Sequence, residues 1–378
     1  MRPGLKQLHL WLGLTLGLFW ALQGLTGACL VFHHELERMA IPRPMSGPIA
    51  PIQDILRSAT QESHGGQITR LSLTDAHSDV VEVSYVDNLQ HPRAILIDAA
   101  TTRLLDERDL EPATPFTGSA SRWVLNFHTS LLSGRGGEII VGISGMVLFT
   151  TAVTGLCLAW PARNGWGAVY SFRRWRTNIQ RLYGWHRALG LTAAAFILFS
   201  ALSGVWMTFE DQLRPALGRA IPHQLPYRPT SNVSRGTVIP AQQAITIAQA
   251  RLPDARWVRI TLPTAKSPVY TIRFHRQGEG TWLGRTSVAV GASTGRIESV
   301  YDSTTVPLSN RIADALLPLH DGERFGAASR VTMMLVGLSI PTLYVTAVWR
   351  WLAQRRKRFP AERSRVLKSE RGPCKRSY

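Results

Sequence analysis

The hydrophobic positions of this chain fall into four long, nearly uncharged runs that are separated by mixed segments. The runs cover roughly Leu8–Phe32, Ile139–Trp160, Leu189–Phe209 and Val331–Trp349. Each is long enough for a helix of about 20 apolar residues to cross the hydrocarbon core of a bilayer. The pattern therefore predicts an integral membrane protein with four transmembrane helices.

The two long segments between these runs show a shorter period. In the first, apolar spacing predicts a helix over Ile52–Ser63, and alternation predicts strands at Thr69–Leu73, Val80–Val86 and Ala94–Ile97. The second segment repeats the order of one helix and then strands, at Ala241–Arg251, Val258–Leu262, Val269–Phe274, Thr286–Val290 and Ile297–Tyr301. Each segment is therefore expected to form an α+β module.

The placement of charge predicts the orientation of the helices. Of the net charge of +18, +16 lies in the N-terminus, the loop 161–183 and the tail from Arg350. Basic residues accumulate on the cytoplasmic side of membrane helices. Both termini are therefore expected in the cytoplasm of a bacterial inner membrane, with both modules in the periplasm. Because the basic residues flank spans and do not form one face, nucleic-acid binding is not expected.

An alternative interpretation of the first run is a lipoprotein signal peptide that ends at Thr26-Gly27-Ala28-Cys29. The apolar run is too long for a signal core, and threonine is a poor residue three positions before the cysteine. A retained helix is therefore the preferred interpretation.

Cysteine usage limits the available redox chemistry. The chain has three cysteines, Cys29, Cys157 and Cys374. They provide no CxxC metal site and no disulfide framework. Any redox function must therefore use a cofactor.

An internal repeat connects the two halves of the chain. The segment around His9 recurs around His186 at a constant offset of 177, and a second match aligns His128 with His320 at an offset of 192. The sequence therefore predicts a tandem duplication whose halves enter the membrane in the same sense. The four histidines then form two pairs, one near each face of the membrane.

These observations divide the chain into eight parts. In order, they are the N-terminus and first transmembrane helix (1–32), the first module (33–136), the second helix (137–160), a basic cytoplasmic loop (161–183), the third helix (184–209), the second module (210–325), the fourth helix (326–351) and a basic cytoplasmic tail (352–378).

Paired histidines on different helices indicate haem. Imidazole is the usual neutral ligand of haem iron, and two imidazoles can occupy both axial positions. His9 with His186 is expected to hold one haem b on the cytoplasmic side, and His128 with His320 a second on the external side. Glycines on the first two helices leave room for a flat macrocycle or serve helix packing: Gly13, Gly17, Gly24, Gly27, Gly142 and Gly145.

Other polar residues near the membrane ends leave alternatives open. His33 or His34 replaces His128 or His320 as a ligand, binds substrate iron outside, or has a surface role. Four arginines are candidate partners of haem propionates, or solvate the interface: Arg122, Arg135, Arg311 and Arg324. The remaining histidines lack metal-ligand spacing and are expected to be surface or structural: His64, His77, His91, His223 and His275.

The ordered motifs resemble the PepSY-associated transmembrane family. They are LHLWLGL at Leu8–Leu14, Phe127-His128, WHRALGL at Trp185–Leu191 and LHDG at Leu319–Gly322. The resemblance extends to about residue 352 and implies that the external modules are PepSY-like domains. The chain is similar in size and layout to FoxB-type ferrisiderophore reductases. That likeness implies haem-mediated delivery of electrons to a ferric siderophore in the periplasm.

Some relatives carry a fused flavin reductase domain, whereas the tail after Arg350 is short and lacks a nucleotide-binding pattern. The electron donor is therefore expected to be a separate protein, a small reductant or a quinol. Two alternatives without redox chemistry are an iron or siderophore transport component and a peptide-binding regulator. A transporter would favour ionisable groups at mid-membrane depth. The four runs are nearly charge-free there.

Overall fold

A computed structural model describes residues 2–370 except 43, 75–78, 115, 117–118, 172–175, 220, 223, 225–236, 266, 278 and 280–281. His77, His223, Cys374 and part of the basic loop lie outside the described residues. The chain divides into two compact units. The helical unit comprises Met1–Ala28, Ile143–Leu202 and Met333–Tyr378, and the sheet unit comprises Cys29–Gly142 and Ser203–Thr332.

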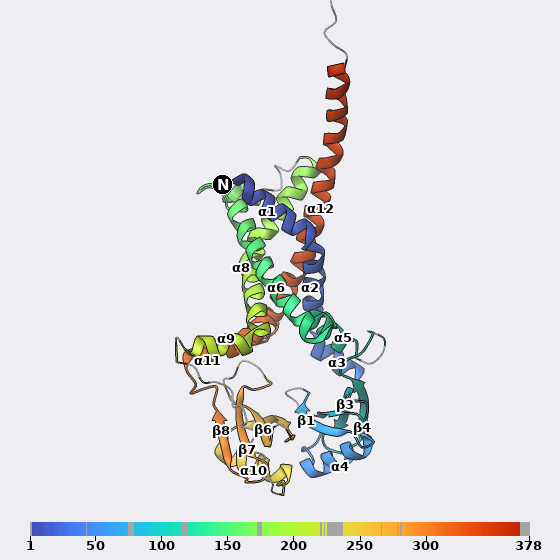
Figure 1. Cartoon of the computed structure of the whole chain (residues 1–378), viewed down its shortest axis with the longest axis vertical. Helices are drawn as coiled ribbons and strands as arrows, with labels where there is room; N and C mark the ends of the chain where they lie inside the picture. The colour runs from blue at the N-terminus through green and yellow to red at the C-terminus, as the bar shows by residue number, and fades with distance from the viewer. Residues whose placement is uncertain are drawn as a thin grey trace, which may run out of the picture. The chain divides into compact units, whose positions relative to one another are not determined.

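Long apolar helices build the helical unit (Figure 1). The helices that belong to it wholly or in large part are α1 (Arg2–Thr15), α2 (Gly17–Leu30), α6 (Gly134–Ala159), α7 (Trp166–Val169), α8 (Asn178–Thr208) and α12 (Ala327–Glu370). Within the described residues, α6, α8 and α12 are each long and apolar enough to cross a membrane. The bent pair of α1 and α2 makes a fourth span if it is counted as one.

Two of the predicted spans show features beyond the sequence pattern. The first is broken, because the chain bends by 61° between α1 and α2. The Thr15 hydroxyl donates to the Trp11 carbonyl at 2.8 Å and Gly17 follows, and both features are typical of helix kinks. The last span is expected to end at residue 351, and the helix that contains it, α12, continues to Glu370.

The sheet unit contains one antiparallel sheet with the strand order β4-β3-β2-β1-β5-β6-β7-β8 (Figure 1). The strands are β1 (Gln67–Leu73), β2 (Val80–Val86), β3 (Pro92–Asp98), β4 (Leu104–Asp109), β5 (Arg256–Thr261), β6 (Val269–His275), β7 (Thr286–Gly291) and β8 (Ile297–Tyr301). The strands of the two predicted modules therefore form a single sheet, joined where Leu71 of β1 pairs with Ile260 of β5. The sequence did not indicate β4, because its charged residues break the alternation.

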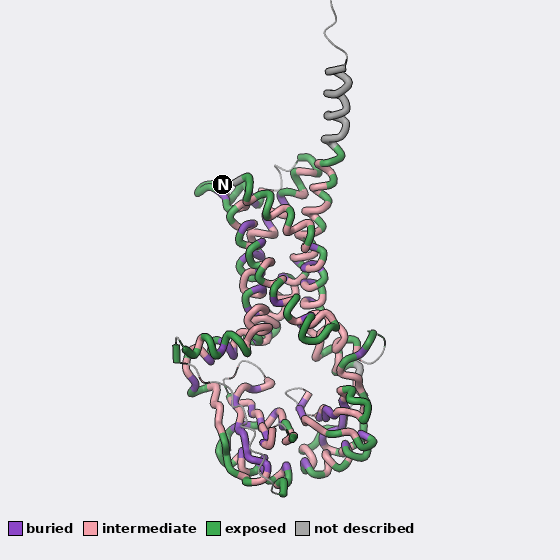
Figure 2. Tube along the Cα trace, viewed as in Figure 1, coloured by how far each residue is buried: buried purple, intermediate pink, exposed green. Residues whose placement is uncertain are grey.

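Two helices cover one face of this sheet (Figure 1). They are α4 (Ile52–Glu62) and α10 (Ala241–Arg251). Ile55, Ala59 and Ala244 are fully buried and belong to the same core as Phe274 of β6. Figure 2 shows buried residues following the strands of the sheet. Apolar burial fixes which side chains face these helices, and the alternate positions form an opposite, polar face.

The first four strands match the last four in their irregularities. Register shifts occur at Ile68/Arg70 and Trp257/Arg259, and again at Leu96/Ile97 and Ala289/Val290. The shifts in β1 and β5 are 189 residues apart in the sequence, and the other two shifts are 193 residues apart. In the next turn, Thr102 and Gly295 both have positive φ, 59° and 65°. The two groups of strands therefore share bulge positions as well as order.

Short helices connect the sheet to the apolar helices. They are α3 (His33–Ala40), α5 (Ala120–Ser130), α9 (Glu210–Gly218), α11 (Leu308–His320) and the 3-10 turn Glu323–Phe325. Arg330, at the start of α12, donates to the Val31 carbonyl at the end of α2 at 2.6 Å. Arg135, at the start of α6, donates to the Thr208 carbonyl at the end of α8 at 3.4 Å. Both arginines satisfy carbonyls that a helix end leaves unpaired.

Candidate functional site

His9 and His186 come together in the helical unit. His9 lies on α1 and His186 on α8, and both are half-buried. The centroids of the two rings are 6.4 Å apart and their planes are inclined by 75°. The fold therefore pairs two imidazoles that are distant in the sequence.

The two rings are anchored in the same way. His9 Nδ1 lies 3.0 Å from the Thr151 carbonyl and 3.2 Å from the Thr154 hydroxyl. His186 Nδ1 lies at the same two distances from the Leu343 carbonyl and the Thr346 hydroxyl. Because a carbonyl only accepts, Nδ1 carries the proton in both rings. Nε2 is therefore left with its lone pair, and this arrangement is typical of metal-ligating histidines.

These anchoring residues were missed in the sequence, although a signal was present. The offset of 192 that aligns His128 with His320 also aligns Thr154 with Thr346. Gly155 makes room for His9, since a Cβ there would approach His9 Cε1 to 2.8 Å. The repeat thus identified the ligand candidates. Continuing the same alignment along α6 and α12 identifies the threonines that contact their Nδ1 atoms.

The spacing of the rings fits one metal ion held between them. A metal–nitrogen bond of about 2.0 Å and a ring radius of about 1.1 Å, both doubled, place two opposed centroids roughly 6.2 Å apart. The observed 6.4 Å matches this separation. Two imidazoles in the axial positions of one haem iron would have a centroid separation of this size.

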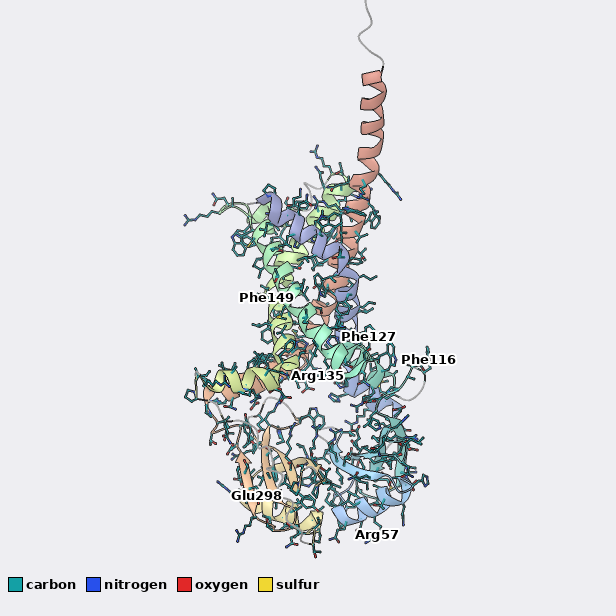
Figure 3. All side chains as sticks on the ribbon, viewed as in Figure 1. Arg57, Phe116, Phe127, Arg135, Phe149 and Glu298 are labelled. Carbon is teal, nitrogen blue, oxygen red and sulfur yellow. The ribbon has the colours of Figure 1, made fainter. Side chains whose placement is uncertain are left out.

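His128 and His320 lie in the sheet unit, in the last turns of α5 and α11. His320 Nδ1 is 2.8 Å from the hydroxyl of Ser203, which is buried. His128 follows Phe127, whose ring stacks on Trp123 with centroids 5.6 Å apart. Phe127 is labelled in Figure 3. Both histidines are half-buried. The structure thus fixes His320 through Nδ1, as it fixes His9 and His186.

A protein-family model for the PepSY-associated TM region matches residues 6–354. The chain belongs to the PepSY-associated TM family. The match includes both histidine pairs and every strand, and it confirms the resemblance found in the sequence. No curated protein matches the chain. Together with the apolar helices, the family identifies a membrane protein.

The alternative ligand candidates of this PepSY-associated protein lie on α3. His33 Nδ1 is 2.5 Å from the Leu30 carbonyl, and the rings of His33 and His34 are 3.8 Å apart. His34 meets Trp282 edge-on at 5.6 Å, and its Nε2 lies 3.7 Å from Glu323. Burial, reinforced by His33, lowers the pKa of His34 to about 4. His34 is therefore neutral at pH 7 and is in contact with other residues of the sheet unit.

The four arginines proposed as propionate partners have different settings. Arg122 is paired with Glu82 at 3.3 Å. Arg135 is paired with Glu138 at 2.7 Å and is labelled in Figure 3. Arg311 and Arg324 are exposed. Their role toward propionates stays a prediction.

The glycines of the first span pack helices. A Cβ on Gly24 would lie 2.6 Å from the Gly337 carbonyl, and Gly17 meets the Tyr344 ring. These contacts hold α2 against α12. A Cβ on Gly13 would meet nothing within 4 Å. The packing alternative thus explains Gly17 and Gly24, and Gly13 alone of these three borders open space.

The other described histidines lie in the sheet unit. His64 and His91 are exposed, and His275 lies 3.7 Å from Glu279. Across the described ranges, no group of three or more His, Cys, Asp or Glu side chains is arranged to hold a metal ion.

Proposed function

We propose that this PepSY-associated protein binds two haem b groups and passes electrons across the bacterial inner membrane to a ferric siderophore in the periplasm. His9 with His186 and His128 with His320 would be the axial ligands. The observation that carries the proposal is the matched anchoring of His9 and His186, whose rings lie 6.4 Å apart with Nε2 available on each.

A tandem duplication explains why the two ligands are matched. The His9 and His186 contacts recur at constant offsets, and the bulges recur in the sheet. In a duplicated chain with parallel halves, equivalent side chains face a common axis. One cofactor on that axis then receives the same ligand from each half. The four-strand groups would be the two PepSY-like modules, joined edge to edge.

The chain's own residues would fix the ligand geometry. The carbonyls of Thr151 and Leu343 hold the protons of the two imidazoles on Nδ1 and set the orientation of the rings. When bound, haem supplies one-electron chemistry, while the protein places it and tunes its potential. The overall change is transfer of one electron from a separate donor to Fe(III), giving Fe(II). Release follows because Fe(II) binds hard oxygen chelators more weakly.

The proposed orientation places His9 and His186 near the cytoplasm and the sheet unit in the periplasm. Basic segments at both termini and at 161–183 support it through the positive-inside rule. The donor would be a cytoplasmic protein, a small reductant or a quinol in the bilayer.

The test is an absorption spectrum of detergent-purified protein, oxidised and dithionite-reduced, with a haem-to-protein ratio. We expect a ratio near two, and reoxidation of the reduced protein on mixing with a ferric siderophore. His9→Ala and His186→Ala should each bring the ratio near one, whereas His91→Ala, at an exposed position, should leave it near two. The proposal fails if the double variant His9→Ala/His186→Ala keeps the full spectrum.

A further inference from the structure

The polar face of the sheet carries arginines at the junction of the two strand groups. A row of cross-strand partners runs over five strands, through Glu82, Ser72, Arg259, Arg273 and Ser287. Arg70 lies two residues before Ser72 on β1 and on the same face. Arg70, Arg259 and Arg273 are called the arginine cluster below. All three are half-buried.

The register places these like charges close together. Arg259 and Arg273 are direct partners on β5 and β6, so their Cβ atoms are about 5 Å apart. Arg70 is diagonal to Arg259 across the β1–β5 pair, at about 7–8 Å. Like charges in such positions repel, and burial strengthens the repulsion.

Neutral groups are the partners of this cluster. Arg70 donates to the Ser84 hydroxyl and Arg259 to the Ser72 hydroxyl, each at 3.1 Å. In the part of the chain that the structure describes, no ion pair reaches any of the three arginines, and Arg70 Nε is buried without a hydrogen-bond partner. The carboxylate in the same row, Glu82, is already paired with Arg122.

The pKa values of two of these arginines reflect burial and mutual repulsion. Burial, followed by the charges of Arg273 and Arg70, lowers the pKa of Arg259 to about 10, although Glu82 acts in the opposite direction. Burial and the charge of Arg285 lower the pKa of Arg273, against the opposing charges of Asp314 and Glu279. Guanidinium groups stay protonated in proteins, so an anion between these three would relieve their repulsion and accept from their N–H donors.

We propose that the arginine cluster binds a net-anionic ferric chelate that presents carboxylate oxygens. This assignment rests on the proposed function for the iron, whereas the anion site itself rests on the cluster alone. Planar guanidinium groups favour bidentate carboxylates.

The experiment uses full-length protein in detergent and a redox-inert probe, the gallium(III)–citrate complex, followed by titration calorimetry. We expect saturable binding that weakens as salt rises. Arg259→Gln/Arg273→Gln should weaken it by about 10- to 100-fold, the loss expected for one or two charge-assisted hydrogen bonds. The control Arg57→Gln/Arg296→Gln removes the same charge from exposed positions, one of them on α4 (Figure 3), and should leave the affinity unchanged.

Thermal unfolding of the same variants separates binding from folding. Because it removes repulsion, Arg259→Gln/Arg273→Gln should be at least as stable as the parent protein without ligand. Unchanged affinity in that folded variant would overturn the anion site. Equal affinity for iron-free citrate, or for a cationic gallium hydroxamate chelate, would overturn the chelate assignment. His9→Ala/His186→Ala should still bind gallium citrate, so loss of haem tests the proposed function without touching this site.

Discussion

The two halves of the chain resemble each other in different ways in the helical unit and in the sheet unit. In the helical unit, side chains are preserved, since His9 and His186 have the same two kinds of partner at the same distances. In the sheet unit, strand order and bulges are preserved while the polar face changes, with Ser84 in β2 where β6 has Arg273. A cofactor shared by two halves needs the same ligand from each. A scaffold needs only its core and register.

The largest expected effect tests whether His128 and His320, in the sheet unit, are the ligands of a second haem. His128→Ala and His320→Ala should each remove the second haem completely and leave the first, since a half-buried axial position that loses its imidazole has no replacement ligand on the same helix. The haem-to-protein ratio and the reduced spectrum check this. His33→Ala and His34→Ala are the matched controls and should retain both haems. If His34→Ala removes a haem and His128→Ala does not, the external site is asymmetric and the assignment of His128 is wrong.

A large effect on stability is expected at a buried ion pair between α9 and α11. Asp314 on α11 accepts from Arg214 at 3.1 Å and from the Tyr301 hydroxyl at 2.6 Å, and both ionic side chains are about nine-tenths buried. Arg214 also pairs with Glu210, so Asp314→Asn leaves the buried guanidinium with one of its two carboxylates and should lower the free energy of unfolding by about 1–3 kcal/mol. Thermal unfolding in detergent measures it.

The first strand group offers the comparison for that variant. Glu82 and Arg122 form a more exposed pair, so Glu82→Gln should cost about 1 kcal/mol or less. Equal losses of unfolding free energy in Asp314→Asn and Glu82→Gln would contradict the expected difference between the two ion pairs.

The sequence predicted features that depend on local pattern. Apolar runs located the helices α6, α8 and α12, and alternation located seven of the eight strands. The joining of β1 to β5 was not predictable, because each group has the same pattern whether its edge is free or paired. The 61° break after α1 also escaped, since Thr15 and Gly17 act through local hydrogen bonding within an unbroken apolar run.

The candidate functional residues were likewise predictable only in part. Self-comparison of the chain identified His9 and His186, and the structure shows their rings in proximity. The arginine cluster was missed, because Arg70 and Arg259 are 189 residues apart and become neighbours only through the β1–β5 register. Most of the net charge lies in the segments that flank the spans, so the charge distribution alone does not distinguish the arginines within strands.

A moderate effect is expected where α2 meets α12 in the helical unit. A Cβ on Gly24 would lie 2.6 Å from the Gly337 carbonyl, which is backbone and cannot move aside cheaply. Gly24→Ala should therefore destabilise the protein by about 1–3 kcal/mol, the range for overpacking. Gly136→Ala, in the first turn of α6 where nothing lies within 4 Å, should be neutral or stabilising. Detergent unfolding curves of both variants check the contrast, and a neutral Gly24→Ala would mean that the helices do not touch.

A pH-dependent effect is expected to distinguish the equivalent turns of the two strand groups. After β3, the Asp98 carboxylate accepts from the amides of Met45, Ala100 and Thr101 at 2.7–3.0 Å. Burial alone would raise the pKa of Asp98, but these hydrogen bonds outweigh it and hold the pKa below its usual value. The resulting stability is present above the unfolded pKa of about 3.9 and is lost as pH falls through the lower folded value.

Asp98→Asn should therefore lower the free energy of unfolding by about 1–3 kcal/mol at pH 7, with the difference shrinking below about pH 4. After β7, the equivalent turn uses a neutral group, the Thr294 hydroxyl, which accepts from the Arg296 amide at 3.2 Å. Thr294→Val should cost about 1 kcal/mol at every pH. Unfolding midpoints at pH 3 and pH 7 decide between them. A pH-independent loss in Asp98→Asn would show that the carboxylate's geometry matters there and its charge does not, so the two turns would be alike after all.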